Sequence, residues 1–161
     1  MKNILDITQA IETSKTLKQE GKQIVLVGGC FDILHPGHIQ FLQQAKAAGD
    51  TLFIFLESDE KITHLKGETR PLHTQVERAA MLIALRFVDY VILLPYFSEN
   101  KQYAELLQQI RPGIIATTEG DPKLANKKKQ AEQIGARVIE VTKYIPNKST
   151  TRLLKVLTDE I

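Results

Sequence analysis

The sequence has little cysteine and no long apolar run. Cys30 is the only cysteine among 161 residues, so no disulfide can form within the chain. No apolar stretch approaches the ~18 residues that a membrane span needs. Asp6 and Glu12 interrupt the apolar residues near the N-terminus, so we expect no signal peptide there. These absences favour a cytoplasmic protein that does not cross a membrane.

Excess charge of one sign is also missing. The 21 basic and 19 acidic residues give a formal net charge of +2, and 43% of the residues are hydrophobic. These values are close to the averages for soluble globular domains, which argues against a disordered chain and against a strongly basic nucleic-acid binder. The length predicts a single domain over residues 1–161, with a flanking helical segment in 1–21 and the core in 22–161.

Short β-rich runs alternate with segments of helical periodicity along the chain. Several of these runs are apolar at successive positions, as expected for strands that helices cover on both faces. The pattern predicts a single Rossmann-like, doubly wound α/β domain, a five-stranded parallel sheet with helices on both faces. The predicted strands are Ile24–Val27, Thr51–Leu56, Tyr90–Leu94, Gly113–Thr117 and Arg137–Val141.

Neither standard phosphate-binding fingerprint is present, which disfavours dinucleotide dehydrogenases and P-loop NTPases. Instead, the first strand leads through Gly28-Gly29-Cys30-Phe31-Asp32-Ile33-Leu34-His35-Pro36-Gly37-His38 directly into a helix. The glycine pair permits close approach of the backbone to a ligand, and the helix N-terminus attracts anions. His35 and His38 lie one turn apart and can face the same anion. The loop therefore predicts a polyphosphate site at the carboxyl end of the first strand.

Three other interpretations of this loop stay open. His38 shares a helical stripe with apolar residues and could be a core or capping histidine. Asp32, His35 and His38 could form a metal triad, although two histidines three residues apart are weak evidence for zinc. Cys30 could be a nucleophile or simply a small packing residue.

The loop resembles the G-x-F-D-x-x-H-x-G-H signature of the cytidylyltransferase-like nucleotidyltransferases, a group with HIGH-type motifs. Matches to the family's other motifs follow in the same order at Lys66-Gly67, at Glu77-Arg78 with Val88-Asp89, and at Ser149-Thr150-Thr151. The resemblance implies transfer of a nucleotidyl group from an NTP to a phosphomonoester, with release of pyrophosphate and usually with Mg²⁺. It also implies a homodimer, for which the helix at residues 6–20 is either a docking or a covering element.

The resemblance assigns roles to individual residues. The catalytic set is His35, His38, Lys66 and Arg78, in which the histidines hold the NTP phosphates and the two cations approach from opposite sides. The nucleotide-binding set is Gly29, Cys30, Phe31, Asp32, Gly37, Ser149, Thr150 and Thr151. No side chain is assigned to the metal, because Mg²⁺ is expected to be held by phosphate oxygens and water.

Within the family, the segment Leu65–Leu72 is most like the L-K-G-x-x-R-P-V of the heptose-1-phosphate adenylyltransferase domain of ADP-heptose synthase. This favours ATP and a sugar 1-phosphate as substrates. Two segments depart from that pattern: Thr117–Pro122 stands where those enzymes carry K-G-G-D-Y, and Tyr144–Lys148 also differs. A CTP-dependent enzyme like glycerol-3-phosphate cytidylyltransferase and a non-catalytic nucleotide-binding module remain the alternatives.

Two further segments carry expectations of their own. The Ser58–His73 stretch is predicted to be an irregular loop of the kind that often forms a lid. The Lys127-Lys128-Lys129 run is predicted to be a solvated helix face, because acidic residues surround it.

Overall fold

The structure, a computed structural model, describes residues 3–143; Tyr144–Lys148 and the predicted Ser149, Thr150 and Thr151 lie outside the described residues. A six-stranded parallel sheet in the order β1-β4-β3-β2-β5-β6 forms its centre. The strands are β1 (Ile4–Leu5), β2 (Ile24–Gly29), β3 (Thr51–Leu56), β4 (Tyr90–Leu93), β5 (Ile114–Thr118) and β6 (Arg137–Thr142).

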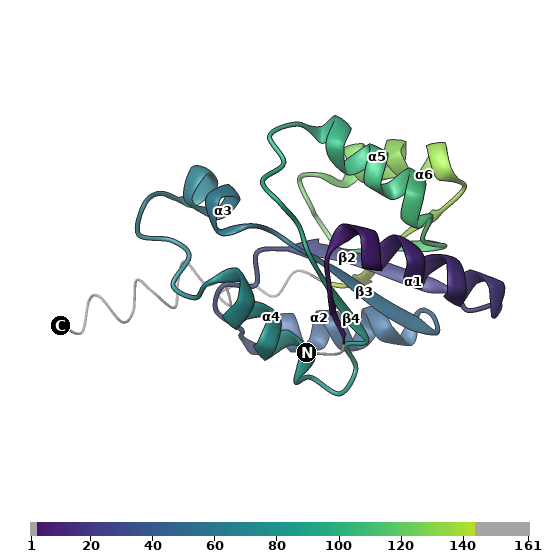
Figure 1. Cartoon of the computed structure of the whole chain (residues 1–161), viewed down its shortest axis with the longest axis horizontal. Helices are drawn as coiled ribbons and strands as arrows, with labels where there is room; N and C mark the ends of the chain where they lie inside the picture. Colours follow the sequence, from purple (N-terminus) through teal and green to yellow (C-terminus); the bar gives the residue numbers. More distant parts are fainter. Residues whose placement is uncertain (1–2, 144–161) are drawn as a thin grey trace.

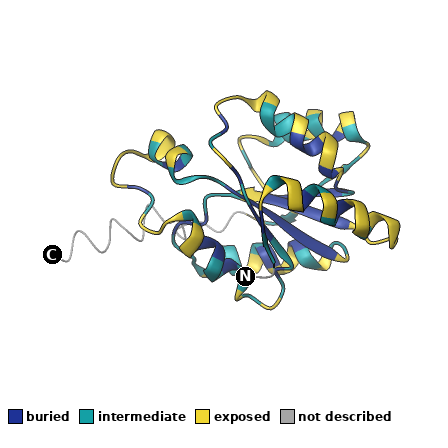
Figure 2. Cartoon of the chain, viewed as in Figure 1, coloured by how far each residue is buried: buried dark blue, intermediate teal, exposed yellow. Residues whose placement is uncertain are grey.

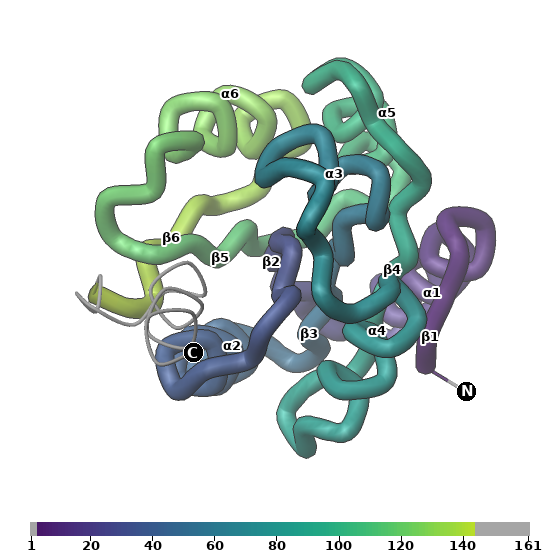
Figure 3. Tube along the Cα trace, turned by 90° about the vertical axis from the view of Figure 1, so that its left-hand side faces the viewer, coloured from purple at the N-terminus to yellow at the C-terminus, as the bar shows by residue number. Residues whose placement is uncertain are grey.

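Helices cover both faces of the sheet (Figures 1 and 3). On one face α1, α5 and α6 pack against the strands, and on the other face α2 and α4 do so. The short α3 lies near the carboxyl edge of the sheet. The helices are α1 (Ile7–Gln19), α2 (Pro36–Ala47), α3 (Asp59–Lys66), α4 (Gln75–Ile83), α5 (Asn100–Ile110) and α6 (Leu124–Ile134). Within residues 3–143, no helix has the length and hydrophobicity that a membrane crossing needs.

The central strands explain the continuous apolar runs. All six residues of β3 are buried, as are the first four of β2, because helices cover both of their faces (Figure 2). Leu42 and Ala45 of α2 pack on one side, and Leu106 and Ile110 of α5 pack on the other. The predicted doubly wound α/β fold is confirmed.

The sheet has one strand more than the five predicted. Ile4 and Leu5 pair in parallel with Val91 and Ile92, so β1 extends the sheet beyond β4. Asp6 follows at once and caps α1 with its side chain. A strand of two residues is too short to show a periodicity of its own, which is why the sequence pattern did not reveal it.

The Ser58–His73 stretch is not irregular throughout, because its first half forms α3. The Ser58 hydroxyl accepts a hydrogen bond from the Lys61 amide at 3.2 Å, and Ile62 is fully buried. The helix ends at Gly67, whose φ of 96° is a conformation that favours glycine. Eight residues with one buried position are too few to display an apolar stripe in the sequence. The second half, residues 67–74, is the irregular loop.

The order of the strands determines where a ligand can bind. The chain passes from β2 through β3 to β4 and then returns to form β5 on the other side of β2. The switch point therefore lies between β2 and β5, which pair at Val25–Ile114 and Leu26–Ile115. In open parallel sheets the crevice outside the carboxyl ends of such strands is the usual binding site. Here the crevice is bounded by the ends of β2 and β5.

Candidate active site

Two pockets open at the carboxyl ends of the strands, one on each side of β2. The first, of about 380 Å³, lies between the β2–α2 loop, the start of α2 and the loop after β5. The second, of about 280 Å³, lies on the opposite face and is lined by side chains of α5 and α6. Five residues line both pockets: Gly28, Gly29, Cys30, Asp121 and Lys127.

The sequence-predicted residues fall into three groups. Those that line the first pocket are Gly29, Cys30, Phe31, His35, Gly37 and His38. Asp32 and Arg78 are buried behind the pocket, and neither is among the described residues that line it. Lys66 is exposed at the end of α3, next to Leu65, which lines the second pocket.

The glycine of the loop permits a tight turn beneath the pocket. A Cβ at Gly29 would lie 2.8 Å from the Phe31 ring, so only glycine allows the ring to pack there. Phe31 has a φ of 46°, which is rare for a residue with a side chain, and its ring is buried. Strained backbone of this kind persists where the surrounding packing holds it, commonly at functional sites.

The two histidines lie together at the N-terminus of α2. His35 is the N-cap, and its Nδ1 accepts a long hydrogen bond from the His38 amide at 3.4 Å. The two imidazole rings stack with their centroids 3.7 Å apart. Burial, together with the charge of the neighbouring His35, lowers the pKa of His38 to about 4. At neutral pH, His38 is therefore uncharged, and its hydrogen bond to the backbone of Ile33 acts on the pKa in the opposite direction without outweighing burial.

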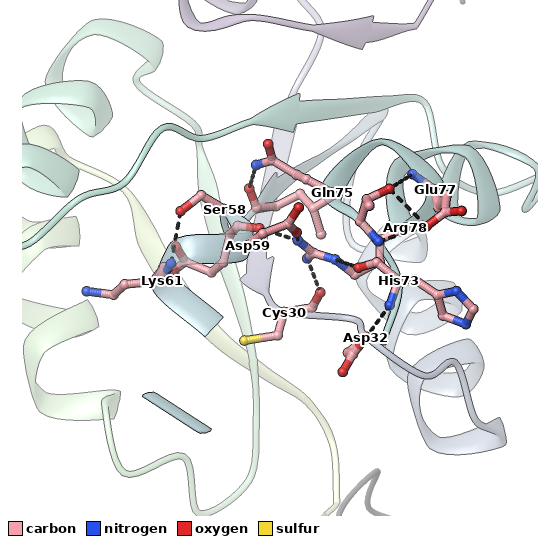
Figure 4. A network of polar contacts seen from close by, with 12 residues as sticks. Cys30, Asp32, Ser58, Asp59, Lys61, His73, Gln75, Glu77 and Arg78 are labelled. Carbon is pink, nitrogen blue, oxygen red and sulfur yellow. Dashed lines mark hydrogen bonds and ion pairs between the residues drawn. The ribbon is translucent and has the colours of Figure 1, made fainter. Parts of the chain in front are cut away.

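Arg78 joins the ends of two strands to two helices (Figure 4). Its side chain is fully buried, and its guanidinium donates to the carbonyl oxygens of Cys30, Glu57 and His73 at 2.6, 2.8 and 3.0 Å. It also donates to the Asp59 carboxylate of α3 at 2.7 Å. With these donors committed to protein oxygens, Arg78 positions the strand ends in this structure.

Asp32 anchors the irregular loop that follows α3. Its buried carboxylate accepts hydrogen bonds from Arg70 Nε at 2.5 Å and from the amides of Leu72 and His73 at 2.8 and 3.2 Å. Burial alone would raise the pKa of Asp32, but these hydrogen bonds outweigh it and lower the pKa. The loop is thereby tied to the β2–α2 turn, which also fixes the end of α3 and with it Lys66.

The alternative roles for this loop are not supported. Burial raises the pKa of the Cys30 thiol, whereas a nucleophilic cysteine needs a lowered pKa. Lys66 acts on that thiol in the opposite direction and also lowers the pKa of His38, but burial is the larger cause in both cases. Residues 3–143 contain no group of three His, Cys, Asp or Glu side chains that could hold a metal ion, so Asp32, His35 and His38 form no metal triad.

The second pocket contains a polar pair that the sequence analysis missed. The Tyr103 hydroxyl of α5 donates to both oxygens of Glu57 at 2.9 and 3.0 Å. Burial raises the pKa of Glu57, opposed by the Tyr103 hydrogen bond and nearby lysines. Burial and the Glu57 charge also raise the pKa of Tyr103. One signal was available: Glu57 follows β3 directly, at the same edge of the sheet as Gly29 of β2.

Lys127 is not the solvated residue that the lysine run predicted. Its ammonium lies 2.6 Å from the Asp121 carboxylate and 3.0 Å from the Thr117 hydroxyl, and its side chain is only 22% exposed. The prediction holds for Lys128 and Lys129, which are exposed. Successive residues of a helix point about 100° apart, so three adjacent lysines cannot share one environment.

Comparison with known proteins agrees with this geometry. A family model described as cytidylyltransferase-like matches residues 26–151, a span that contains the strand ends and histidines of the first pocket. The chain belongs to the cytidylyltransferase-like family. The family predicted from the sequence motifs is confirmed.

Curated relatives of this cytidylyltransferase-like chain are much longer than it is. Two are named bifunctional protein HldE: one from Nitratiruptor sp. is 38% identical over 152 residues, and one from Pelobacter propionicus is 40% identical over 140 residues. These alignments cover 94% and 86% of this chain but only 31% and 28% of the relatives. The chain thus spans less than a third of the length of either relative.

Two solved structures are similar to this cytidylyltransferase-like chain. A lipopolysaccharide core biosynthesis protein from Thermoplasma volcanium is 25% identical, with a TM-score of 0.61 over 78% of this chain and 98% of that one. A pantoate-beta-alanine ligase from Francisella tularensis gives a TM-score of 0.64 over 99% of this chain and 78% of that one, with 16% identity. The second likeness concerns the fold alone.

Proposed function

We propose that this protein transfers the adenylyl group of ATP to a sugar 1-phosphate, with heptose 1-phosphate as the acceptor, and releases pyrophosphate. The observation that carries the proposal is the pair of pockets that meet at Gly28, Gly29 and Cys30. Group transfer between two substrates requires both to be held with the reacting atoms in contact. The choice of ATP and heptose rests on the HldE relatives and on the Leu65–Leu72 segment, which resembles heptose-1-phosphate adenylyltransferases.

The first pocket suits the nucleoside triphosphate. The positive end of the α2 helix dipole favours an anion there. His35 and His38 line the same end of the pocket, and His38 is uncharged at pH 7. Lys66 adds positive charge from the α3 side of the cleft. In this assignment the triphosphate lies over the β2–α2 turn, with its α-phosphate near Gly29 and Cys30.

The second pocket suits a phosphorylated polyol. Its walls combine apolar strand residues with polar side chains of α5 and α6 that can bind hydroxyl groups. Glu57 is held by Tyr103 and offers acceptor oxygens, while amide side chains offer both donors and acceptors. Two lysines supply charge for a phosphate. The polar side chains that line this pocket are Glu57, Asn100, Tyr103, Asp121, Lys123, Asn126, Lys127 and Gln130.

The reaction needs no protein nucleophile. An oxygen of the acceptor phosphate attacks the α-phosphorus of ATP and forms a new P–O bond. The bond from the α-phosphorus to the α,β-bridging oxygen breaks, and its electron pair leaves with pyrophosphate. Catalysis then rests on alignment and on stabilising negative charge in the transition state. The protonated Cys30 thiol at the meeting point is compatible with this, since it carries no charge that would repel phosphate.

Mg²⁺ fits the site only as an ion that enters with the nucleotide. The carboxylates of Asp121 and Glu57 are engaged by Lys127 and Tyr103, and the described residues hold no group of three metal-ligating side chains. Phosphate oxygens and water would therefore supply its ligands, as is usual for Mg²⁺ with nucleotides. When bound, the ion would neutralise charge on the triphosphate. The homodimer implied by the family resemblance stays a prediction.

A pyrophosphate-release assay tests the proposal. The protein is mixed with Mg²⁺, with ATP or CTP, and with heptose 1-phosphate or glycerol 3-phosphate, and pyrophosphate is measured by a coupled enzyme. We expect ATP with heptose 1-phosphate to react fastest. If CTP and glycerol 3-phosphate react faster, the protein is instead a CTP-dependent enzyme like glycerol-3-phosphate cytidylyltransferase. Protection of the fold against heating by an NTP, without pyrophosphate from any pair, would favour the non-catalytic module.

A further inference from the structure

Lys127 lies at the boundary between the two pockets. It belongs to the first turn of α6, outside every motif that the sequence analysis connected with the reaction. Of the residues that line both pockets, only Lys127 carries a positive charge. The other lysines in the described linings face one pocket each: Lys143 the first, and Lys123 the second. A cation is therefore placed where the two cavities meet.

The neighbours of Lys127 hold its ammonium in one position. Asp121 accepts from Nζ at 2.6 Å, and the Thr117 hydroxyl accepts from it at 3.0 Å. Asp121 is fixed in turn, because it also accepts from the Thr117 hydroxyl at 2.5 Å and from the Lys123 amide at 2.7 Å. An ammonium has three N–H donors, and these two contacts use two of them. The third remains for a phosphate oxygen.

The positive charge of the Lys127 ammonium can offset repulsion between the two substrates. In the reaction proposed above, two anionic phosphates must come into contact, and their repulsion opposes the approach. A fixed cation beside the point of contact lowers this barrier, and it does so without reorganisation because its position is already set. The partly buried Asp121 limits the cost of holding the ammonium out of water.

We infer that Lys127 is a catalytic residue, whose ammonium holds the phosphate of the acceptor against the α-phosphate of the nucleotide. The inference rests on the proposed function, since it adds a residue that contacts substrate in the same two pockets. It assigns the loop after β5 a supporting role: Thr117 and Asp121 position the lysine that α6 supplies. The resulting contact is specific to a phosphorylated acceptor, and an acceptor without a phosphate would not gain from it.

Matched lysine variants test the inference. Lys127→Met removes the charge and keeps the length of the side chain, while Lys128→Met and Lys129→Met make the same change at the exposed positions that follow. Binding of heptose 1-phosphate is measured by calorimetry in the presence of α,β-methylene-ATP, and turnover is measured with ATP. For Lys127→Met we expect binding weaker by about ten-fold or more and kcat lower by roughly 100-fold. The two control variants should match the wild type in both measurements.

A second variant separates contact with phosphate from a structural role. Asp121→Asn removes the charge of the partner but keeps the lysine and an oxygen that can accept from it, so we expect it to lose less acceptor binding than Lys127→Met. Lys127→Arg should recover part of the binding. If Asp121→Asn loses as much acceptor binding as Lys127→Met, the lysine serves only the ion pair and the inference is wrong.

The outcomes also separate this inference from the proposed function. If the wild type turns over and Lys127→Met has the same acceptor binding and kcat, the inference is wrong and the proposed function stands. Lys127-dependent binding of heptose 1-phosphate without turnover overturns the function and supports the contact. Absence of both binding and turnover in the wild type overturns both.

Discussion

Burial of the His38 imidazole makes the fold sensitive to acid. The pKa of His38 falls from its ordinary value near 6.5 to about 4, because burial disfavours the charged ring and the charge of the neighbouring His35 opposes a second one. The unfolded chain therefore binds a proton near pH 6.5 that the native protein takes up only near pH 4. By linkage, the contribution of His38 to stability is complete above pH 6.5 and is lost progressively as the pH falls towards 4.

This sensitivity can be measured with one substitution. We expect the free energy of unfolding of the wild type to decrease more steeply between pH 7 and pH 4.5 than that of His38→Gln, which cannot be protonated. Urea unfolding at a series of pH values provides both curves, and carboxylates that titrate in the same range contribute equally to each. Parallel curves would contradict the assigned burial of the imidazole.

Residues of the site differ in how far the sequence reveals them. His35 and His38 were predictable, because one helical turn at the end of a strand brings them together without help from the rest of the fold. Glu57 and Tyr103 are 46 positions apart, and only the packing of α5 over the end of β3 makes them partners. Lys127 was assigned to solvent because charge runs usually are solvated, whereas its helix turns this one lysine inward.

At the scale of elements, Arg78 is the most connected side chain of the site. Four hydrogen bonds join α4, on which it lies, to the ends of β2 and β3, to the start of α3 and to the residue before the capping box of α4. The sequence motif identified Arg78 as a site residue, but it did not reveal which groups Arg78 contacts. Its contacts assign it the positioning of the elements that bear the substrate-facing groups.

Removal of Arg78 should cost much more stability than removal of an exposed arginine. Arg78→Met would leave three carbonyl oxygens and the Asp59 carboxylate without their donor, so we expect a loss of about 3–5 kcal/mol in the free energy of unfolding. Arg86→Met, at an exposed position shortly after α4, is the matched control and should change it by no more than about 0.5 kcal/mol. Chemical denaturation measures both. Similar small losses would show that the Arg78 contacts do not brace the strand ends.

Elements of ordinary length were predicted closely, and the shortest ones were not. The predicted strand at Thr51–Leu56 coincides with β3, and the predicted strand at Tyr90–Leu94 is one residue longer than β4. The two-residue β1 and the eight-residue α3 depend on partners elsewhere, namely the edge of β4 and the buried site of Ile62. Local sequence patterns do not contain that information.

For the whole molecule, the two helical layers explain why there are two pockets. The sheet separates the cavities, and they meet where β2 ends at Gly28 and Gly29 and beside Asp121 and Lys127. α1 packs on the same face as α5, with Ala10 fully buried, so this helix covers the sheet of its own chain. The net charge of +2 conceals an uneven distribution, since Lys127 lines both pockets while Lys143 and Lys123 line one pocket each.

The fate of the α-phosphorus of ATP tests the central claim most directly. The protein is incubated with Mg²⁺, heptose 1-phosphate and ATP labelled with ³³P at the α-position, and the products are separated by ion-exchange chromatography. The account predicts that the label appears in a nucleotide sugar in which AMP is joined to the sugar phosphate, with unlabelled pyrophosphate formed in equal amount. Label that remains in ATP, or that appears only as AMP while heptose 1-phosphate is unchanged, would contradict it.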